Sequence, residues 1–246
     1  MKIKLMVILG INTMSIRKRV TLEASSRSTS FLVLGLVIAS SLLIMPRVYQ
    51  RLGFSPFASI VIVLFLAITS LLLSDTNIPL TLIRIKNYIQ NKDVEVLLTL
   101  NVGGAVIPLI VSIHILIVLQ LRYSLTLIIS AISVAMVSLI VYRVSRVVDN
   151  VGITVPLVIP PLTAASATLI LTELFRYPLF LAGPLSYVAG TIGTLIGADV
   201  YKLREIVLQA SRKHIVSIGG FGTFDSVYLS GILSAATTIL LLLITT

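Results

Sequence analysis

Residues 183–200 read GPLSYVAGTIGTLIGADV and residues 217–231 read SIGGFGTFDSVYLSG, and these two stretches decide what kind of protein the chain is. In the first, small residues recur every four positions within an apolar run that ends at Asp199. In the second, a glycine-rich segment leads to Asp225, where the last apolar run begins. Each aspartate therefore lies at the edge of a hydrophobic segment, where an ionisable side chain is a candidate for function.

The composition of the chain indicates a protein of the lipid bilayer. Hydrophobic residues make up 57% of the sequence and charged residues 11%, against about 25% charged residues in soluble domains. The net charge of +10 does not indicate nucleic acid binding, because the basic residues are scattered between apolar runs and are not clustered with aromatic residues. The absence of cysteine excludes disulfides and thiolate metal sites. We therefore expect the bilayer as partner, without a cofactor, a bound metal or nucleic acid, and the oligomeric state stays open.

The apolar runs predict an all-α polytopic membrane protein with about seven transmembrane helices, since about 20 residues cross the hydrocarbon layer. The expected spans are residues 31–45, 54–74, 102–121, 123–142, 153–174, 179–200 and 217–244. Pro46 is expected to end the first span, and three prolines are expected to break the fifth. Residues 79–100 mix β-branched and charged residues around a polar turn, which predicts an interfacial β-hairpin, with an amphipathic surface loop as the alternative.

The basic residues predict the orientation of these spans. Residues 1–30 form an expected basic cytosolic tail, with Met14 as a second usable start, and residues 31–246 form a single transmembrane domain. In this arrangement 15 of the 19 Lys and Arg residues fall in segments on one side. Because cytoplasmic loops carry the excess of basic residues, we expect a multi-pass protein of the cell membrane with its N-terminus inside and its C-terminus outside.

Both aspartates allow a structural and a functional interpretation. Asp199 lies in the last turn of its predicted helix, where the helix dipole disfavours a carboxylate. It could form a salt bridge to Lys202, or it could bind a proton, a cation or a substrate group. Asp225 could be the N-cap of a helix over residues 225–244, preceded by a loop that dips into protein or water. For Asp225 the cap role and a site role are compatible.

Small residues and one histidine complete the set of candidates. The small residues of 189–198 recur every four positions in two adjacent rows, which allow another helix to approach closely. His114 lies in the middle of a predicted span, where it is either functional or a neutral imidazole bonded to a neighbouring carbonyl. The candidate substrate- or ion-binding residues are Asn101, Gly103, Gly104, His114, Pro160, Asp199, Gly220, Thr223 and Asp225, and the two aspartates are also the candidate catalytic residues.

Three motifs carry a resemblance to a known family: NVGGAVIP at 101–108, GTLIGAD at 193–199 and GGFGTFD at 219–225. From about residue 75 onward the chain resembles the uncharacterised prokaryotic membrane family called domain of unknown function sixteen-fourteen. The resemblance implies no activity. It implies only that the asparagine, glycines and aspartates of these motifs are the places to look for a site.

A second resemblance is to the presenilin and signal-peptide-peptidase class of intramembrane aspartyl proteases. Those proteins pair a Tyr-Asp or Phe-Asp motif with a Gly-x-Gly-Asp motif, and Phe224-Asp225 is similar to the first. Gly197-Ala198-Asp199 lacks the glycine directly before the aspartate, and the order of the two motifs is reversed. These departures make an enzyme the weaker expectation.

Three functions follow from these features. The leading hypothesis is a transporter or channel whose broken fifth span, glycine row and two aspartates form a polar pocket for a small solute, a proton or a cation. The enzyme alternative is an intramembrane aspartyl protease, in which two carboxylates share a proton. The third is a scaffold without catalytic activity.

Overall fold

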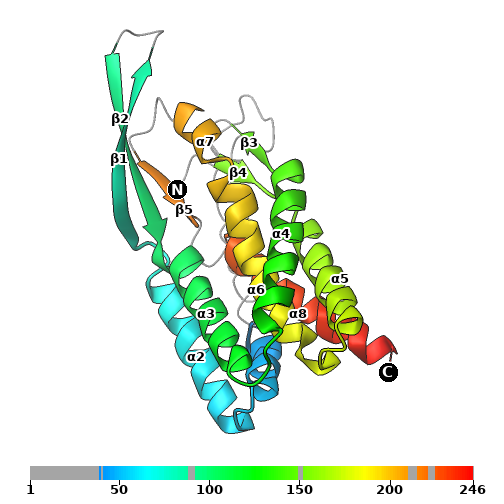
Figure 1. The fold of residues 1–246 in the computed structure, drawn as a ribbon. Helices are drawn as coiled ribbons and strands as arrows, with labels where there is room; N and C mark the ends of the chain where they lie inside the picture. The colour runs from blue at the N-terminus through cyan, green and yellow to red at the C-terminus, as the bar shows by residue number, and fades with distance from the viewer. Residues whose placement is uncertain are drawn as a thin grey trace, which may run out of the picture.

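The structure, a computed structural model, describes residue 39 and residues 41–87, 92–148, 152–209, 215–220 and 225–245. Most of these residues are helical, and the main helices lie side by side in one bundle with a small sheet at one end (Figure 1). The predicted basic tail of residues 1–30 and the candidate Thr223 lie outside the described residues.

The helices follow the apolar runs of the sequence, because a helix satisfies its own backbone hydrogen bonds within lipid. Residues 41–51 form a first helical segment. The remaining helices are α2 (Pro56–Leu72), the π-helix η1 (Val102–Val106), α3 (Ile107–Gln120), α4 (Thr126–Val144), α5 (Ile159–Leu174), the short 3₁₀-helix η2 (Leu179–Leu181), α6 (Ala182–Thr194), the π-helix η3 (Leu195–Val200), α7 (Leu203–Gln209) and α8 (Ser226–Thr245).

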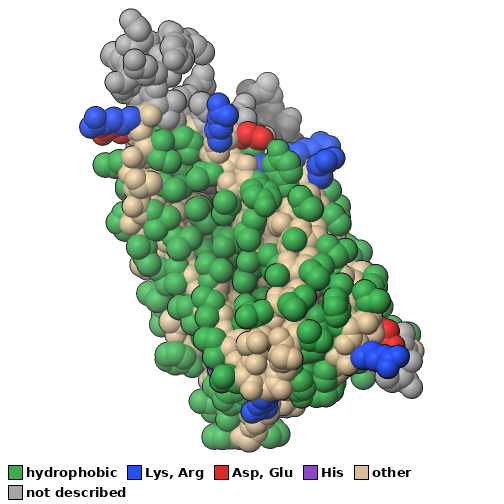
Figure 2. All heavy atoms as spheres, in the orientation of Figure 1, with side chains coloured by type: hydrophobic (Ala, Val, Ile, Leu, Met, Phe, Trp, Pro, Cys, Tyr) green, Lys and Arg blue, Asp and Glu red, His purple; other side chains and the backbone are tan. Residues whose placement is uncertain are grey.

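Four helical segments among the described residues are long and apolar enough to cross a membrane. They are Val102–Gln120, Thr126–Val144, Leu179–Val200 and Ser226–Ile244. The apolar helices α2 and α5 are shorter. Figure 2 shows charged side chains gathered at the two ends of the molecule and hydrophobic side chains over the surface between them. This is the surface of a multi-pass membrane protein, although the predicted number of seven spans is not confirmed.

Prolines act differently from the prediction in two helices. The helical segment of residues 41–51 continues through Pro46, which was expected to end it. The helix expected from residue 153 begins only at Ile159, so Pro160 lies in its first turn and does not break it. The missing N–H of a proline has no effect in the first turn, because those amides lack helical partners anyway. The predicted span over residues 153–174, which was expected to be kinked or broken, thus contains a shorter helix that begins just before its pair of adjacent prolines, with Pro156 outside the helix.

The last predicted span is also shorter than expected. It begins at Ser226 and not at residue 217, because residues Ile215–Ile218 form strand β5. A strand here places the glycines that follow it in a turn. Residues 215–218 are thus a strand and not part of the predicted loop, Gly219 and Gly220 form a turn, and Asp225 directly precedes α8.

The predicted hairpin is present, which decides against the surface loop. Strand β1 (Asn77–Asn87) pairs antiparallel with β2 (Lys92–Asn101), and β5 pairs parallel with β2, so the sheet order is β1-β2-β5. A separate short pair, β3 (Arg146–Val148) and β4 (Gly152–Thr154), joins α4 to α5. Both sheets lie at the same end of the bundle (Figure 1).

Helix α6 is the buried centre of the bundle, and its small residues explain why. Nearly all of its side chains are buried. A Cβ atom at Gly193 would lie 2.6 Å from Cβ of Val137 on α4, and one at Gly190 would overlap Ser234 on α8. The two predicted rows of small residues therefore face two different helices, α4 and α8, and each allows close packing.

Candidate functional site

The three glycine-containing motifs meet at one place, although they lie far apart in the sequence. Ala105 of the first, Leu195 of the second and Val227, two residues after Asp225, form one buried apolar cluster. A Cβ atom at Gly219 would lie only 2.7 Å from Cβ of Ala105, so the turn after β5 rests directly on η1. The motifs thus form one structural unit at the sheet end of the bundle.

Parallel pairing of β2 and β5 brings two of the motifs together. Leu100 is paired with Ile218, so both strands end at the same edge of the sheet. From this edge, β2 continues into Asn101 and η1, and β5 continues into the turn of Gly219 and Gly220. In parallel sheets, the segments that follow the carboxyl ends of the strands are the usual place for a site.

Both membrane-spanning segments at this place contain a π-helix. Residues of the first motif form η1 at the start of the α3 span, and Asp199 lies in η3 at the end of the α6 span. A π-helix is rare, and it is frequently found at functional sites. A side chain also bonds to the backbone of η1: Oγ of Ser70 donates a hydrogen bond to the carbonyl of Gly103 at 2.9 Å.

Asp199 lies where the three motifs meet, and one of its carboxylate oxygens has no hydrogen-bond donor among the described residues. The backbone amide of Gly219 donates to its carboxyl group, and the negative charge of Asp225 acts on the same group. Its Oδ2 atom is shielded from solvent, and no donor among the described residues reaches it. A buried carboxylate oxygen without a donor has a high free-energy cost unless a proton or a cation neutralises it.

Lys202 does not supply the positive charge that would neutralise Asp199. Its Nζ atom donates instead to the carbonyl of Ser145, the C-cap of α4, at 2.5 Å and lies 5.4 Å from the ring centre of Tyr142. Of the two interpretations of Asp199, the salt bridge to Lys202 is therefore wrong, because the end of α4 offers the ammonium group a buried carbonyl. A cation is favourable at the C-terminus of a helix.

Asp225 is the N-cap of α8. Its Oδ1 atom accepts a hydrogen bond from the backbone N–H of Val227 at 2.9 Å, and Asp225 is only 7% exposed. The N-terminus of a helix stabilises a negative charge. The two aspartates are thus placed at opposite helix ends, Asp225 where the dipole favours a charge and Asp199 where it does not.

The chain was compared with known proteins. The family model described as "Protein of unknown function (DUF1614)" matches residues 57–237. The chain belongs to this family. The search of curated proteins and the search of solved structures gave no match. The matched region of this DUF1614 member contains all three motifs and both aspartates, and it gives no support to the resemblance to intramembrane proteases.

Asn101 and the glycines of the first motif shape the backbone of this DUF1614 site. Nδ2 of Asn101 donates to the carbonyl of Ser74 at 2.7 Å, and its Oδ1 atom accepts from the amide of Gly104 at 2.8 Å. A Cβ atom at Gly103 would overlap the backbone of Ser70 on α2. These residues therefore anchor the start of η1 to α2, and their contacts do not leave the Asn101 side chain free for a ligand.

Two of the other predicted residues lie outside this unit. His114 packs against the rings of Tyr49 and Phe54, with ring centres 5.8 and 5.9 Å away. It is nine residues after Ala105 along the η1 and α3 helix, roughly 13 Å at about 1.5 Å per residue. Pro160 is buried in the first turn of α5, and no contact links it to the aspartates. Neither residue joins the site among the described contacts.

Of two adjacent glycines, the structure places Gly219 against Asp199, whereas the predicted candidate was Gly220. Gly220 is exposed, whereas Gly219 is buried against η1 and donates to Asp199. Gly219 also has a φ of +69°, a conformation that favours glycine over other residues. The pair of adjacent glycines was the available signal, but only tertiary contacts distinguish its members.

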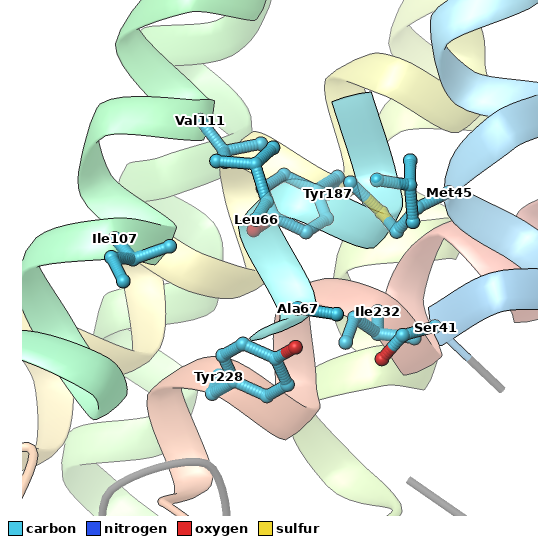
Figure 3. A pocket seen from close by; sticks show the side chains of 10 residues that line it. Ser41, Met45, Leu66, Ala67, Ile107, Val111, Tyr187, Tyr228 and Ile232 are labelled. Atoms are coloured by element: carbon cyan, nitrogen blue, oxygen red, sulfur yellow. The ribbon is translucent and has the colours of Figure 1, made fainter. Parts of the chain in front are cut away.

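A small cavity beside the site was also missed by the sequence analysis. It lies among the first helical segment, α2, α3, α6 and α8, and its volume of about 20 Å³ holds roughly one water molecule. Figure 3 shows the hydroxyl groups of Tyr228 and Ser41 in its lining, with Tyr228 one turn after Asp225. Tyr187 also lines the cavity, the other lining side chains are apolar, and the space is too small for an organic solute.

Proposed function

We propose that this DUF1614 protein is a membrane transporter whose Asp199–Asp225 pair binds a proton or a small cation during transport. The observation that carries the proposal is the buried Oδ2 atom of Asp199, which has no donor among the described residues, while the negative charge of Asp225 acts on the same carboxyl group. An ionisable side chain in a membrane-spanning segment commonly marks an ion or proton pathway.

The surroundings of the pair favour a small occupant. The described cavity nearby holds roughly one water molecule, and a Cβ atom at Gly190 or Gly197 would overlap the neighbouring helix, so the helices are closely packed here. The two π-helical segments, η1 at the start of the α3 span and η3 at the end of the α6 span, also support a site here, because π-helices are frequent at functional sites. A proton or a desolvated cation fits this space, whereas a larger solute would require the helices to separate.

We also infer that the sheet end of the bundle faces the cytosol. The segments that carry 15 of the 19 basic residues belong to this end or to the N-terminal tail. The other four basic residues belong to the opposite end, where Arg122 donates to the carbonyl of Leu52 and Arg51 donates to that of Phe180. Both aspartates then lie on the cytosolic side, with the N-terminus inside and the C-terminus outside.

The test is ion flux into liposomes that contain the purified protein. An internal pH dye reports proton flux and an internal cation dye reports sodium or potassium flux, each driven by an imposed gradient. Asp199→Asn removes the charge but keeps the shape, and we expect its flux to fall to that of empty liposomes. Asp225→Asn keeps the N-cap, so it tests the charge of Asp225 while α8 stays capped.

The matched control is Asp75→Asn, which changes an exposed aspartate in the turn before β1. We expect its flux to equal that of the wild type. Wild-type liposomes that conduct no more than empty ones, or full flux in Asp199→Asn, would refute the transport proposal. Cleavage of a single-span reporter by the wild type but not by Asp199→Asn would establish the protease instead. If the aspartate variants lose neither ion flux nor cleavage, the scaffold is the remaining hypothesis.

A further inference from the structure

Three buried tyrosines and His114 lie in the bundle between the aspartates and the end opposite the sheets, and the proposed site does not use them. Tyr228, Tyr187 and Tyr49 are 8%, 2% and 1% exposed. Each brings a hydroxyl group into an apolar interior, where a polar group has a free-energy cost unless it has a hydrogen-bond partner. Phenol and imidazole groups can both accept and donate a proton, so the order of these four side chains along the bundle is informative.

Tyr228 is the first of these side chains beyond the aspartates. It lies three residues after the N-cap Asp225, in the first turn of α8. Its hydroxyl group bonds to the side chains of Ser41 on the first helical segment and Ser70 on α2. Ser70 in turn donates to the carbonyl of Gly103 in η1. Hydrogen bonds therefore connect Tyr228 to the first π-helix of the site.

The small cavity lies between Tyr228 and Tyr187 of α6. Both tyrosines and Ser41 line it, and the remaining lining side chains are apolar (Figure 3). The ring of Tyr187 would lie 3.0 Å from a Cβ atom at Gly231, which is three residues after Tyr228 on α8. A water molecule in a protein needs about two to four polar partners, and three hydroxyl groups surround this space of about 20 Å³. One water can therefore bridge the two tyrosines.

From Tyr187 the series continues toward the end of the bundle opposite the sheets. Tyr187 is 12 residues before Asp199 on the same helical segment, roughly 18 Å at about 1.5 Å per residue. Its side chain is near enough to that of Tyr49 for the two to interact electrostatically. Tyr49 packs against His114 of α3, with ring centres 5.8 Å apart. Tyr49 is also two residues before Arg51, which belongs to the opposite end of the bundle.

We propose that the transported ion is a proton, and that Tyr228, Tyr187, Tyr49 and His114 carry it between the aspartates and the opposite end of the bundle. This inference rests on the proposed transport function and names the ion and its route. A metal cation needs a ring of oxygen ligands in place of its hydration shell, and the mostly apolar cavity does not offer one. A proton needs only a series of groups that both accept and donate, and such series carry protons in pumps and transporters.

The transfer regenerates each group of the route. At His114, one ring nitrogen accepts a proton and the other releases its own. Each tyrosine oxygen accepts a proton from one side and releases its hydroxyl proton on the other, and the bridging water does the same. The last proton of the series ends on a carboxylate oxygen of the Asp199–Asp225 pair. One proton has then entered the route and one has left it, so the transfer needs no co-reactant.

Phenylalanine substitutions test the route, because they remove a hydroxyl group and keep the ring. Tyr187→Phe and Tyr228→Phe are compared with the wild type in liposomes that contain the internal pH dye. Tyr177→Phe is the matched control, since Tyr177 is 6% exposed but its hydroxyl group bonds to Thr126 of α4, outside the route. We expect the proton flux of the two route variants to fall to that of empty liposomes and Tyr177→Phe to conduct like the wild type. We expect the cation dye to report no sodium or potassium flux in the wild type.

The possible results distinguish the route from the proposed site. Full proton flux in either route variant, with none in Asp199→Asn, would overturn the route and leave the site. An equal loss in Tyr177→Phe, or sodium or potassium flux in the wild type, would also overturn this inference alone. Wild-type liposomes that conduct no ion would refute transport itself, and the route with it. A route variant that circular dichroism shows to be unfolded in detergent is replaced by Tyr49→Phe, for which we expect the same loss of proton flux.

Discussion

A glycine on α8 offers a direct test of how the bundle is packed around the site. A Cβ atom at Gly231 would overlap Oγ1 of Thr191 on α6 and would lie 3.0 Å from the ring of Tyr187. Ordinary carbon contacts are about 3.5–4.0 Å, so Gly231→Ala must push α6 and α8 apart. Such overpacking destabilises by roughly 1–3 kcal/mol, and the better helix propensity of alanine offsets up to about 1 kcal/mol.

The net expectation for Gly231→Ala is a loss of about 1–2 kcal/mol in the free energy of unfolding. For a chain of this length, that corresponds to a melting temperature lower by about 2–8 °C. The measurement is thermal or dodecyl-sulfate unfolding in detergent micelles, followed by circular dichroism. Gly183→Ala is the matched control, because its Cβ atom would meet Ile239 at an ordinary 3.4 Å, and we expect it to unfold like the wild type.

A second substitution makes the test specific to the Gly231–Thr191 contact. Oγ1 of Thr191 lies beside Tyr187 but makes no hydrogen bond of normal geometry within the described residues, so Thr191→Ala should cost only about 1 kcal/mol of methyl burial. In the double variant the overlap with Oγ1 of Thr191 is gone and only the 3.0 Å contact with the Tyr187 ring remains, so its stability should return most of the way to that of Thr191→Ala. The expected coupling energy is about 1–2 kcal/mol. The packing argument is wrong if Gly231→Ala unfolds like the wild type, or if Thr191→Ala does not rescue it.

Three further substitutions follow from single contacts. Asn101→Ala should lower the free energy of unfolding by about 2–3 kcal/mol in the same assay, because it leaves buried backbone groups at the start of η1 without partners, and an unchanged stability would contradict that role. Lys202→Met should lower it by about 1 kcal/mol, because the apolar stem is kept but the bond to Ser145 is lost, and no change would show that this bond is dispensable. Arg84→Ala should change it by less than about 1 kcal/mol, since its pair with Glu95 is largely exposed, and a larger loss in unfolding would mean that the pair is shielded in the membrane.

The aspartates illustrate how far local sequence can be interpreted. That Asp225 caps a helix follows from an aspartate directly before 20 apolar residues, because capping involves only neighbouring backbone groups. The salt bridge considered for Asp199 also involved only a neighbouring residue, Lys202. Lys202 donates instead to the carbonyl of Ser145 at the end of α4, which is far away in the sequence. Local rules hold where no tertiary partner competes for the same group.

By itself, the sequence determined the membrane class, the hairpin and most of the apolar helices, since hydropathy and β-branched runs act within one segment at a time. Tertiary structure alone decided that β5 pairs parallel with β2, that the small-residue rows face α4 and α8 separately, and that Gly219 rather than Gly220 contacts Asp199. The physical reason is that these contacts join segments far apart in the chain, and their partners are chosen by shape and hydrogen bonding in the folded bundle, which no periodicity within a single segment records.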